Sequence, residues 1–128
     1  MPTPNSPTPR FWSSESSAPT VLVADDEKNV RLTLQQALED LGLAVETASD
    51  GTEALNCLEK GDYDLMMLDL RMPGMGGLEV LQRARRSSPD LPIVIVTAHG
   101  TVQNAVQAMR RGAVDVLLKP LSLDSIRA

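Results

Sequence analysis

LMMLDLRMPGMGG, residues 65–77, is the stretch that decides how this chain folds. Its first four residues are apolar without interruption, which predicts a strand that is buried on both faces of a parallel sheet. The proline and glycines that follow Asp69 predict that the strand ends there in a loop. Asp69 is therefore expected at the rim of a hydrophobic core, although a single aspartate in such a place is usually a turn or cap residue.

The same pattern recurs along the chain, as an apolar run, a loop and then apolar residues at helical spacing. The strands are expected at residues 21–24, 43–47, 65–68, 93–96 and 114–118. Helices are expected between them, each ending at a glycine or at a Ser-Ser-Pro sequence. The fourth helix carries its apolar residues on one face, at Val102, Ala105, Val106 and Met109. A fifth helix, capped by Ser122, would be truncated at Ala128, short of the usual three or so turns.

Strands that alternate with helices predict a parallel sheet with helices on both faces, joined by right-handed crossovers. The unbroken apolar runs that begin at residues 21, 65 and 93 belong in the middle of the sheet, and the more mixed second and fifth strands belong at its edges. This pattern suits a doubly wound, flavodoxin-like α/β fold of five strands in the order 2-1-3-4-5, with five helices of which the last is truncated.

The composition of the chain is that of one globular domain with an aliphatic core. The 128 residues are 42% hydrophobic and 23% charged, but only 2% aromatic. Residues 1–19 differ from the rest, because their prolines, serines and threonines cannot bury enough apolar surface to fold. We therefore expect a disordered tail at 1–19, in which Phe11 and Trp12 leave open a docking peptide, and a folded domain at 20–128.

Charge and cysteine content exclude several classes of function. The net charge of −5 gives no electrostatic footprint for direct nucleic-acid contact or for an anionic membrane surface. No apolar run reaches the length of a membrane span, and no secretory signal is recognisable. The single cysteine, Cys57, excludes an internal disulfide and is expected to be a packing residue. A cytoplasmic location is the expectation that follows.

Polar residues follow the predicted strands at the points where the strands end. These are Asp25 and Asp26 after the first strand, Asp69 after the third, Thr97 after the fourth and Lys119 after the fifth. Parallel strands place their carboxyl ends at one rim of the sheet, where open α/β folds bind ligands. Three carboxylates at this rim would raise one another's pKa unless a cation were bound. All-oxygen ligation of this kind predicts Mg²⁺, or alternatively Mn²⁺.

This set of residues favours the capture of a phosphoryl group. An aspartate is ionised at neutral pH, so Asp69 needs no general base to attack phosphorus. Lys119 offers a positive charge and Thr97 a hydroxyl donor to the phosphoryl oxygens. Neither is a general base in its ordinary state, which predicts phosphoryl capture rather than hydrolysis.

With these motifs in order, residues 20–128 resemble a response-regulator receiver domain. The matching sequences are the pair Asp25-Asp26, LDLRMPGMGG around Asp69, VTAHG around Thr97 and GAVDVLLKP up to Pro120. The resemblance implies that Asp69 accepts a phosphoryl group from a histidine kinase. It also implies that Asp26 binds the metal directly, Asp25 mainly through water and Arg71 through its backbone carbonyl. The Lys119-Pro120 peptide bond would be cis.

The family's switch and partners follow from the same resemblance. Thr97 and Lys119 would move toward the phosphoryl group and repack the face formed by helix 4, strand 5 and helix 5, which is also a potential homodimer surface. TAHG and the helix after it resemble receivers of the NtrC type, which regulate an attached ATPase and DNA-binding domain. His99 and Arg71 flank the site in the family pattern. This chain departs from the pattern at Val116, where most receivers have an aromatic residue, and at Gly76, where Asp or Asn is usual.

Other functions are open to a chain with these residues. A vestigial receiver would act as an interaction or dimerisation module without phosphorylation, and Val116 favours that alternative. A haloacid-dehalogenase-like phosphatase carries a second aspartate two residues after its nucleophile, but here that position is Arg71. No GxxxxGK[ST] sequence is present, so a P-loop nucleotide site is unsupported.

Overall fold

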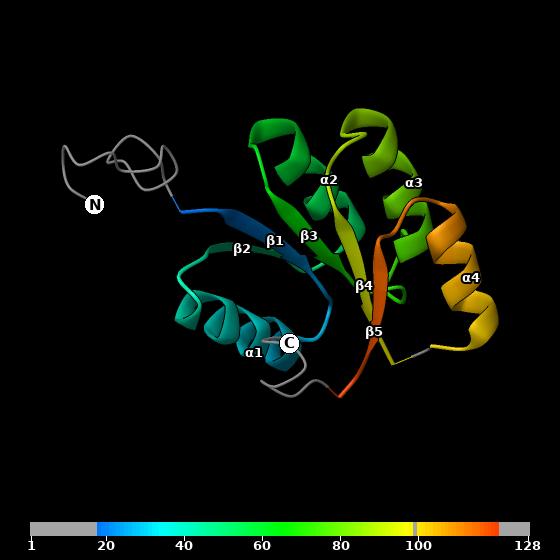
Figure 1. Ribbon diagram of the computed structural model, residues 1–128, viewed down its shortest axis with the longest axis horizontal. Coiled ribbons are helices and arrows are strands. Elements are labelled where there is room, and N and C mark those ends of the chain that lie inside the picture. The colour runs from blue at the N-terminus through cyan, green and yellow to red at the C-terminus, as the bar shows by residue number, and fades with distance from the viewer. Residues whose placement is uncertain (1–17, 99, 121–128) are drawn as a thin grey trace, which may run out of the picture.

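The computed structural model describes residues 18–98 and 100–120, which form a five-stranded sheet flanked by four helices (Figure 1). The strands are β1 (Thr20–Ala24), β2 (Ala44–Ala48), β3 (Leu65–Leu68), β4 (Ile93–Thr97) and β5 (Asp115–Leu118). The helices are α1 (Lys28–Asp40), α2 (Gly51–Lys60), α3 (Gly77–Ser87) and α4 (Val102–Arg110). The tail up to residue 17, His99 and the expected fifth helix after Ser122 lie outside the described residues.

The sheet is parallel throughout, and its order is β2-β1-β3-β4-β5, which confirms the predicted topology. The uninterrupted apolar strands β1, β3 and β4 occupy the centre, because each buries both of its faces. The mixed strands β2 and β5 lie at the edges. In register, Leu68 at the end of β3 lies between Ala24 of β1 and Ile95 of β4. The ends of the three central strands are therefore adjacent.

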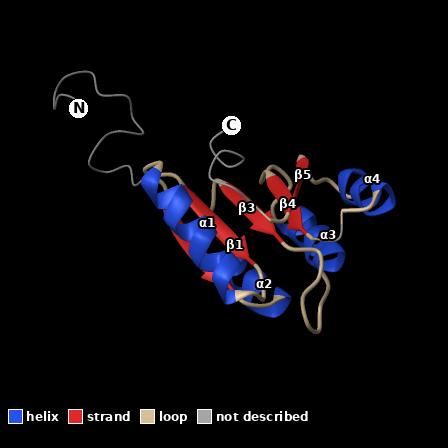
Figure 2. Ribbon diagram, turned by 90° about the horizontal axis from the view of Figure 1, so that it is seen from below, coloured by secondary structure: helices blue, strands red, loops and turns tan. Residues whose placement is uncertain are grey.

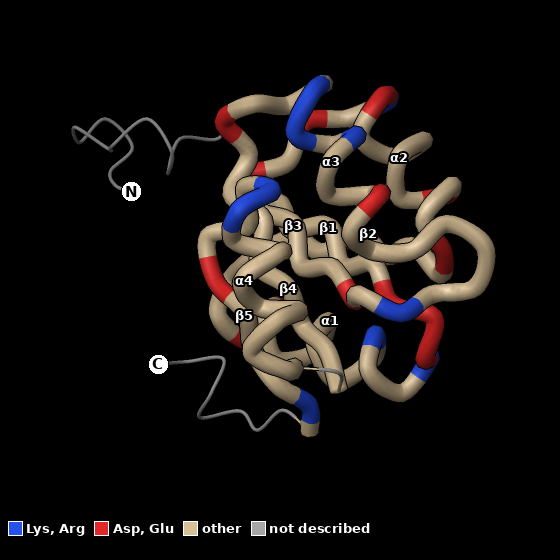
Figure 3. The backbone as a smooth tube through the Cα atoms, turned by 90° about the vertical axis from the view of Figure 1, so that its right-hand side faces the viewer, with Lys and Arg blue, Asp and Glu red and all other residues tan. Residues whose placement is uncertain are grey.

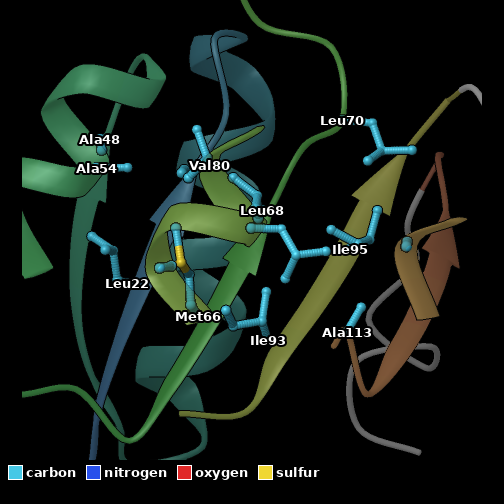
Figure 4. Close-up of a cluster of buried hydrophobic side chains, with 14 of the residues drawn as sticks. Leu22, Ala48, Ala54, Met66, Leu68, Leu70, Val80, Ile93, Ile95 and Ala113 are labelled. Carbon is cyan, nitrogen blue, oxygen red and sulfur yellow. The ribbon is translucent and has the colours of Figure 1, made fainter. Parts of the chain in front are cut away.

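Alternate residues of the strands enter two separate cores, one on each face of the sheet. On one face, Leu34 and Leu38 of α1 pack with Val23 and Val96. On the other face, α2, α3 and α4 cover a larger core that includes Met66, Leu68 and Ile95 (Figures 2 and 4). Cys57 packs against this larger core, as expected of a small side chain on α2.

Local sequence explains where the helices begin. The Asp50 side chain caps α2 by accepting a hydrogen bond from the Glu53 N–H at 2.8 Å, and the Thr101 hydroxyl accepts one from the Asn104 N–H at 3.1 Å at the start of α4. The N-cap residue of α3 is Gly76, which has no side chain to cap the helix. The first residue of α3, Gly77, must be a glycine, because a Cβ atom there would overlap the backbone carbonyl of Asp69.

Arginines gather at the carboxyl ends of α3 and α4, which lie near each other in Figure 3. The Arg85 guanidinium donates hydrogen bonds to the carbonyl oxygens of Leu91 at 2.7 Å and Gly112 at 2.8 Å. It thereby ties the loop after α3 to the turn after α4. Gly112 has a φ of 108°, the left-handed conformation that commonly ends a helix.

The apolar face predicted for α4 exists, but it points to solvent. Val102 is 82% exposed, Val106 42% and Met109 49%, whereas the residue that α4 buries is Ala108. The spacing of apolar residues predicts a helical face correctly, yet it does not say which side of the helix the sheet covers. The exposed apolar residues of α4 therefore form a surface rather than a core.

Candidate functional site

The polar residues at the strand ends come together at one rim of the sheet. The three polar side chains buried in the described part of the chain are Asp25, Asp69 and Thr97, with exposures of 1%, 3% and 0%. Asp25 follows β1, Asp69 follows β3 and Thr97 is the last residue of β4. Burial of a polar group is costly unless a partner compensates it, so three such groups at one place indicate a site.

Lys119, directly after β5, supplies the compensating charge. Its ammonium nitrogen lies 2.9 Å from Asp25 Oδ2 and 3.4 Å from Asp69 Oδ2, and the side chain is only 9% exposed. The same nitrogen lies 2.8 Å from Glu27 Oε1. The Lys119-Pro120 peptide bond is cis, as the resemblance to receiver domains implies. Lys119 therefore bridges carboxylates from three separate places in the chain.

The carboxylates form a set that suits a divalent cation. Oxygen atoms of Asp25, Asp26, Glu27 and Asp69 lie within 4.8 Å of one another. In the described part of the chain the buried Asp25 Oδ2 has no hydrogen-bond donor of good geometry and is met only by the Lys119 ion pair. Hard oxygen ligands with a surplus of negative charge fit Mg²⁺ or Mn²⁺ better than zinc. The residues present therefore fit the predicted metal.

Backbone donors hold the two buried carboxylates in place. The Glu27 N–H donates to Asp25 Oδ1 at 2.9 Å, and the Arg71 N–H donates to Asp69 Oδ1 at 3.3 Å. The second bond brings the backbone of Arg71 beside Asp69, where the resemblance to receiver domains implies that its carbonyl binds the metal. The Arg71 side chain is exposed.

Opposing effects of burial and of neighbouring charges set the pKa values of Asp69 and Lys119. Burial, and secondarily the charge of Asp25, raises the pKa of Asp69 above its ordinary value, against the lowering effects of the Arg71 N–H and Lys119. Burial acts to lower the pKa of Lys119, but its hydrogen bond to Glu27 and its ion pair with Asp25 outweigh burial and raise that pKa. The site therefore holds excess negative charge that a single ammonium does not fully balance.

Thr97 joins the site to the loop that leads into α4. Its backbone carbonyl accepts a hydrogen bond from the Lys119 N–H at 2.9 Å, so β4 and β5 are linked at the rim itself. Leu118, the residue before Lys119, covers Gly100, and a Cβ atom on Gly100 would overlap the Leu118 side chain. The loop after Thr97 is therefore packed directly against the end of β5.

Sequence reasoning places Asp25, Asp69 and Lys119 correctly at one rim, but it misses Glu27. Glu27 lies in the acidic run after β1, which is a signal, yet acids on exposed loops are common. Its contact with Lys119 spans 92 positions of sequence, and no local pattern reveals such a pair.

Comparison with known proteins agrees with this geometry. A family model described as the response regulator receiver domain matches residues 21–128. The chain is 40% identical over 111 residues to the C4-dicarboxylate transport transcriptional regulatory protein DctD of Rhizobium meliloti, covering 87% of this chain and 24% of that protein. It is 40% identical over 104 residues to the DNA-binding transcriptional regulator NtrC of Escherichia coli, covering 81% and 22%. The chain thus spans about a quarter of the length of these curated relatives.

Solved structures show the same fold. The receiver domain of NtrX from Brucella abortus is 35% identical, with a TM-score of 0.79, covering 84% of this chain and 91% of that one. The chemotaxis protein CheY4 of Vibrio cholerae is 30% identical, with a TM-score of 0.82, covering 86% and 93%. In the described ranges, no helix is long and apolar enough to cross a membrane.

Proposed function

The chain belongs to the response regulator receiver domain family, and we propose that it is a phosphoacceptor of a two-component system, in which a histidine kinase transfers a phosphoryl group to Asp69. The observation that carries the proposal is the Lys119 ammonium, held between the buried carboxylates of Asp25 and Asp69 at the rim where the central strands end. The protein acts as a regulator in the cytoplasm and assists only its own phosphorylation and dephosphorylation.

Asp69 performs the covalent step. A carboxylate oxygen of Asp69 attacks phosphorus while the P–N bond of the kinase's phosphohistidine breaks, and its electron pair leaves on the imidazole, which takes up a proton. Asp69 Oδ1 is held by the Arg71 N–H, while Oδ2 faces Lys119. Asp69 is thereby oriented before a phosphodonor arrives.

Asp25, Asp26, Asp69 and the backbone carbonyl of Arg71 would hold a Mg²⁺ ion, with Mn²⁺ as a substitute. When bound, such an ion neutralises charge on the transferring oxygens. It would also offset the repulsion between Asp25 and Asp69 that raises the pKa of Asp69.

Lys119 and Thr97 would receive the phosphoryl oxygens. Lys119 already contacts Asp69 Oδ2, so a small displacement of its ammonium suffices to pair with a phosphoryl oxygen. The buried Thr97 ends β4 beside this position and supplies a hydroxyl donor. A hydrogen bond from the backbone N–H of Lys119 to the backbone carbonyl of Thr97 links the two residues.

The output surface is the face formed by α4 and β5. Thr97 movement would shift the loop that Gly100 occupies and displace Leu118, which covers Gly100. Val116, which replaces an aromatic residue, packs half-buried against the larger core, so we assign the relay to the Gly100–Leu118 contact. The exposed Val102, Val106 and Met109 then present the surface that changes.

This surface has two proposed partners, a second copy of the chain and an attached output domain. The curated relatives named above are transcriptional regulators about four times as long as this chain, which supports an output of the same NtrC type. DNA contact would belong to such an output, because this chain carries a net charge of −5.

A second candidate function is a vestigial receiver that binds partners through α4 without phosphorylation. Val116 favours it, since the usual aromatic relay is missing. Amide chemical shifts with Mg²⁺ and beryllofluoride separate the two functions: shifts confined to the acidic rim, with α4 unchanged, would support the vestigial module.

Labelling with acetyl phosphate tests the proposed chemistry. In Mg²⁺ we expect intact-mass spectra to show one added phosphoryl group, and none with Asp69→Asn or after metal chelation. Asp90→Asn is the matched control, because Asp90 is an exposed acid near the start of β4, at the other end of the sheet. Normal labelling of the Asp69→Asn variant would contradict the assignment.

A further inference from the structure

We propose that Glu27 is a positioning residue that competes with the phosphoryl group for Lys119, and so sets how readily Asp69 is phosphorylated. The inference rests on the proposed function of Asp69. It concerns a residue outside the expected set of Asp25, Asp26, Asp69, Thr97 and Lys119.

The contacts of Lys119 rank the three carboxylates around it. Glu27 Oε1 lies at 2.8 Å from the ammonium nitrogen, Asp25 Oδ2 at 2.9 Å and Asp69 Oδ2 at 3.4 Å. The longest of these contacts is the one to the residue that reacts. An ammonium has three protons to donate, so each short contact to another carboxylate is one less for a phosphoryl oxygen.

Among these three carboxylates, Glu27 can most easily lose its contact with Lys119. Its side chain is 59% exposed, whereas the Asp25 side chain is 2% exposed and fixed by a backbone donor. Water can solvate the released Glu27 carboxylate, but it cannot reach Asp25 as easily. Replacing the Glu27 contact therefore costs the least free energy when Lys119 pairs with a phosphoryl oxygen.

The position of Glu27 on α1 supports a directed role for its side chain. Glu27 is the N-cap residue of α1, where a carboxylate is stabilised by the helix dipole, but its side chain makes no capping hydrogen bond. The side chain instead reaches across to accept a hydrogen bond from the Lys119 ammonium at 2.8 Å. The backbone N–H of the same residue holds Asp25. One residue thus orients a carboxylate with its backbone and restrains the ammonium with its side chain.

The test is a beryllofluoride titration at saturating Mg²⁺, followed by the amide signals of Asp69, Thr97 and Lys119. We expect Glu27→Gln, which keeps the shape and removes the charge, to bind beryllofluoride roughly two- to fivefold more tightly, the range of an exposed ion pair. Glu39→Gln, at an exposed acid on the same helix, should bind like the unaltered protein. The Mg²⁺ affinity is titrated separately without beryllofluoride. It should fall by no more than about fivefold in Glu27→Gln, because Glu27 adds a nearby negative charge but is not a metal ligand in the proposed set.

A double variant checks that Glu27 acts through Lys119. On a Lys119→Met background the gain from Glu27→Gln should disappear, because no ammonium is left to compete for. An unchanged or weaker beryllofluoride affinity of Glu27→Gln would overturn the proposal, and a large loss of Mg²⁺ affinity would show that Glu27 binds the metal instead. If the unaltered protein failed to bind beryllofluoride at all, the proposed function itself would fail.

Discussion

Both ends of the sheet carry aspartates, but only one end buries them. At the end where the strands begin, Asp62, Asp64 and Asp90 are exposed, and Asp64 accepts a hydrogen bond from the Thr20 N–H at 2.8 Å. At the end where the strands finish, Asp25 and Asp69 are almost fully buried around Lys119. Aspartate is thus a solvated surface residue at one end of the sheet and a buried carboxylate that needs a positive partner at the other. Burial and a shared ammonium, rather than the number of acids, distinguish the site.

The largest expected effect is on the rate of phosphorylation, in two variants that each lack one acid, at opposite ends of the sheet. Asp26→Ala should reduce Mg²⁺-dependent labelling by acetyl phosphate about 100-fold or more, because the proposed metal site would lose its direct ligand Asp26. Asp62→Ala should leave the rate unchanged. Equal rates for the two variants, measured by intact mass over time, would remove the distinction between the two ends.

The next effect is on stability and tests whether Lys119 compensates buried charge. Without metal, Lys119→Met should lower the free energy of unfolding by roughly 1–3 kcal/mol, since Asp25 and Asp69 would face each other unpaired. Added Mg²⁺ should restore part of the loss by binding the folded state. Lys60→Met, at the exposed end of α2, is the control in urea denaturation. A Lys119 variant as stable as that control would contradict the ion-pair account.

A smaller effect of opposite sign is expected at Asp69. Because the pKa of Asp69 is raised in the fold, its protonated form is favoured there, so its stabilising contribution is present below the unfolded pKa and lost as pH rises through the folded pKa. Metal-free Asp69→Asn should therefore be more stable than the unaltered protein at pH 7, by on the order of 1 kcal/mol. The difference should vanish below about pH 4, where the unfolded carboxylate is protonated.

Asp64→Asn provides the contrast at the other end of the sheet. It should gain nothing at pH 7, because it weakens a charged acceptor of the Thr20 N–H in an exposed place. The measurement is the thermal unfolding of Asp69→Asn and Asp64→Asn with a chelator present. A similar gain in stability for Asp64→Asn would mean that burial is not the cause of the gain at Asp69.

The smallest effect concerns an acid added beside the site rather than removed from it. Gly76 has an extended conformation with a φ of −73°. The atom closest to a Cβ added at Gly76 would be the Leu70 carbonyl oxygen, at 3.8 Å, so a side chain fits there. Gly76→Asp should therefore cap α3 and stabilise the protein by a few tenths of a kcal/mol. A loss of stability would show that the excess negative charge of the rim extends to the start of α3.

The sequence predicts the sheet order and most of the site for one physical reason. Uninterrupted apolar runs identify the central strands, and parallel strands must finish at one rim, so Asp25, Asp69 and Thr97 had to converge. What it does not predict depends on packing between distant segments. Apolar spacing in α4 could not reveal that Ala108, rather than Val106, faces the core. The Glu27–Lys119 pair has no local signature either.

The central claim is that separate strand ends form one metal-dependent phosphoryl site at Asp69. The most direct measurement is the crystal structure of the chain with Mg²⁺ and beryllofluoride. The account predicts beryllium on an Asp69 carboxylate oxygen, fluorine atoms within hydrogen-bond distance of Thr97 and Lys119, and the ion held by Asp26. Beryllium bound elsewhere, or an ion that does not contact Asp26 and Asp69, would contradict it.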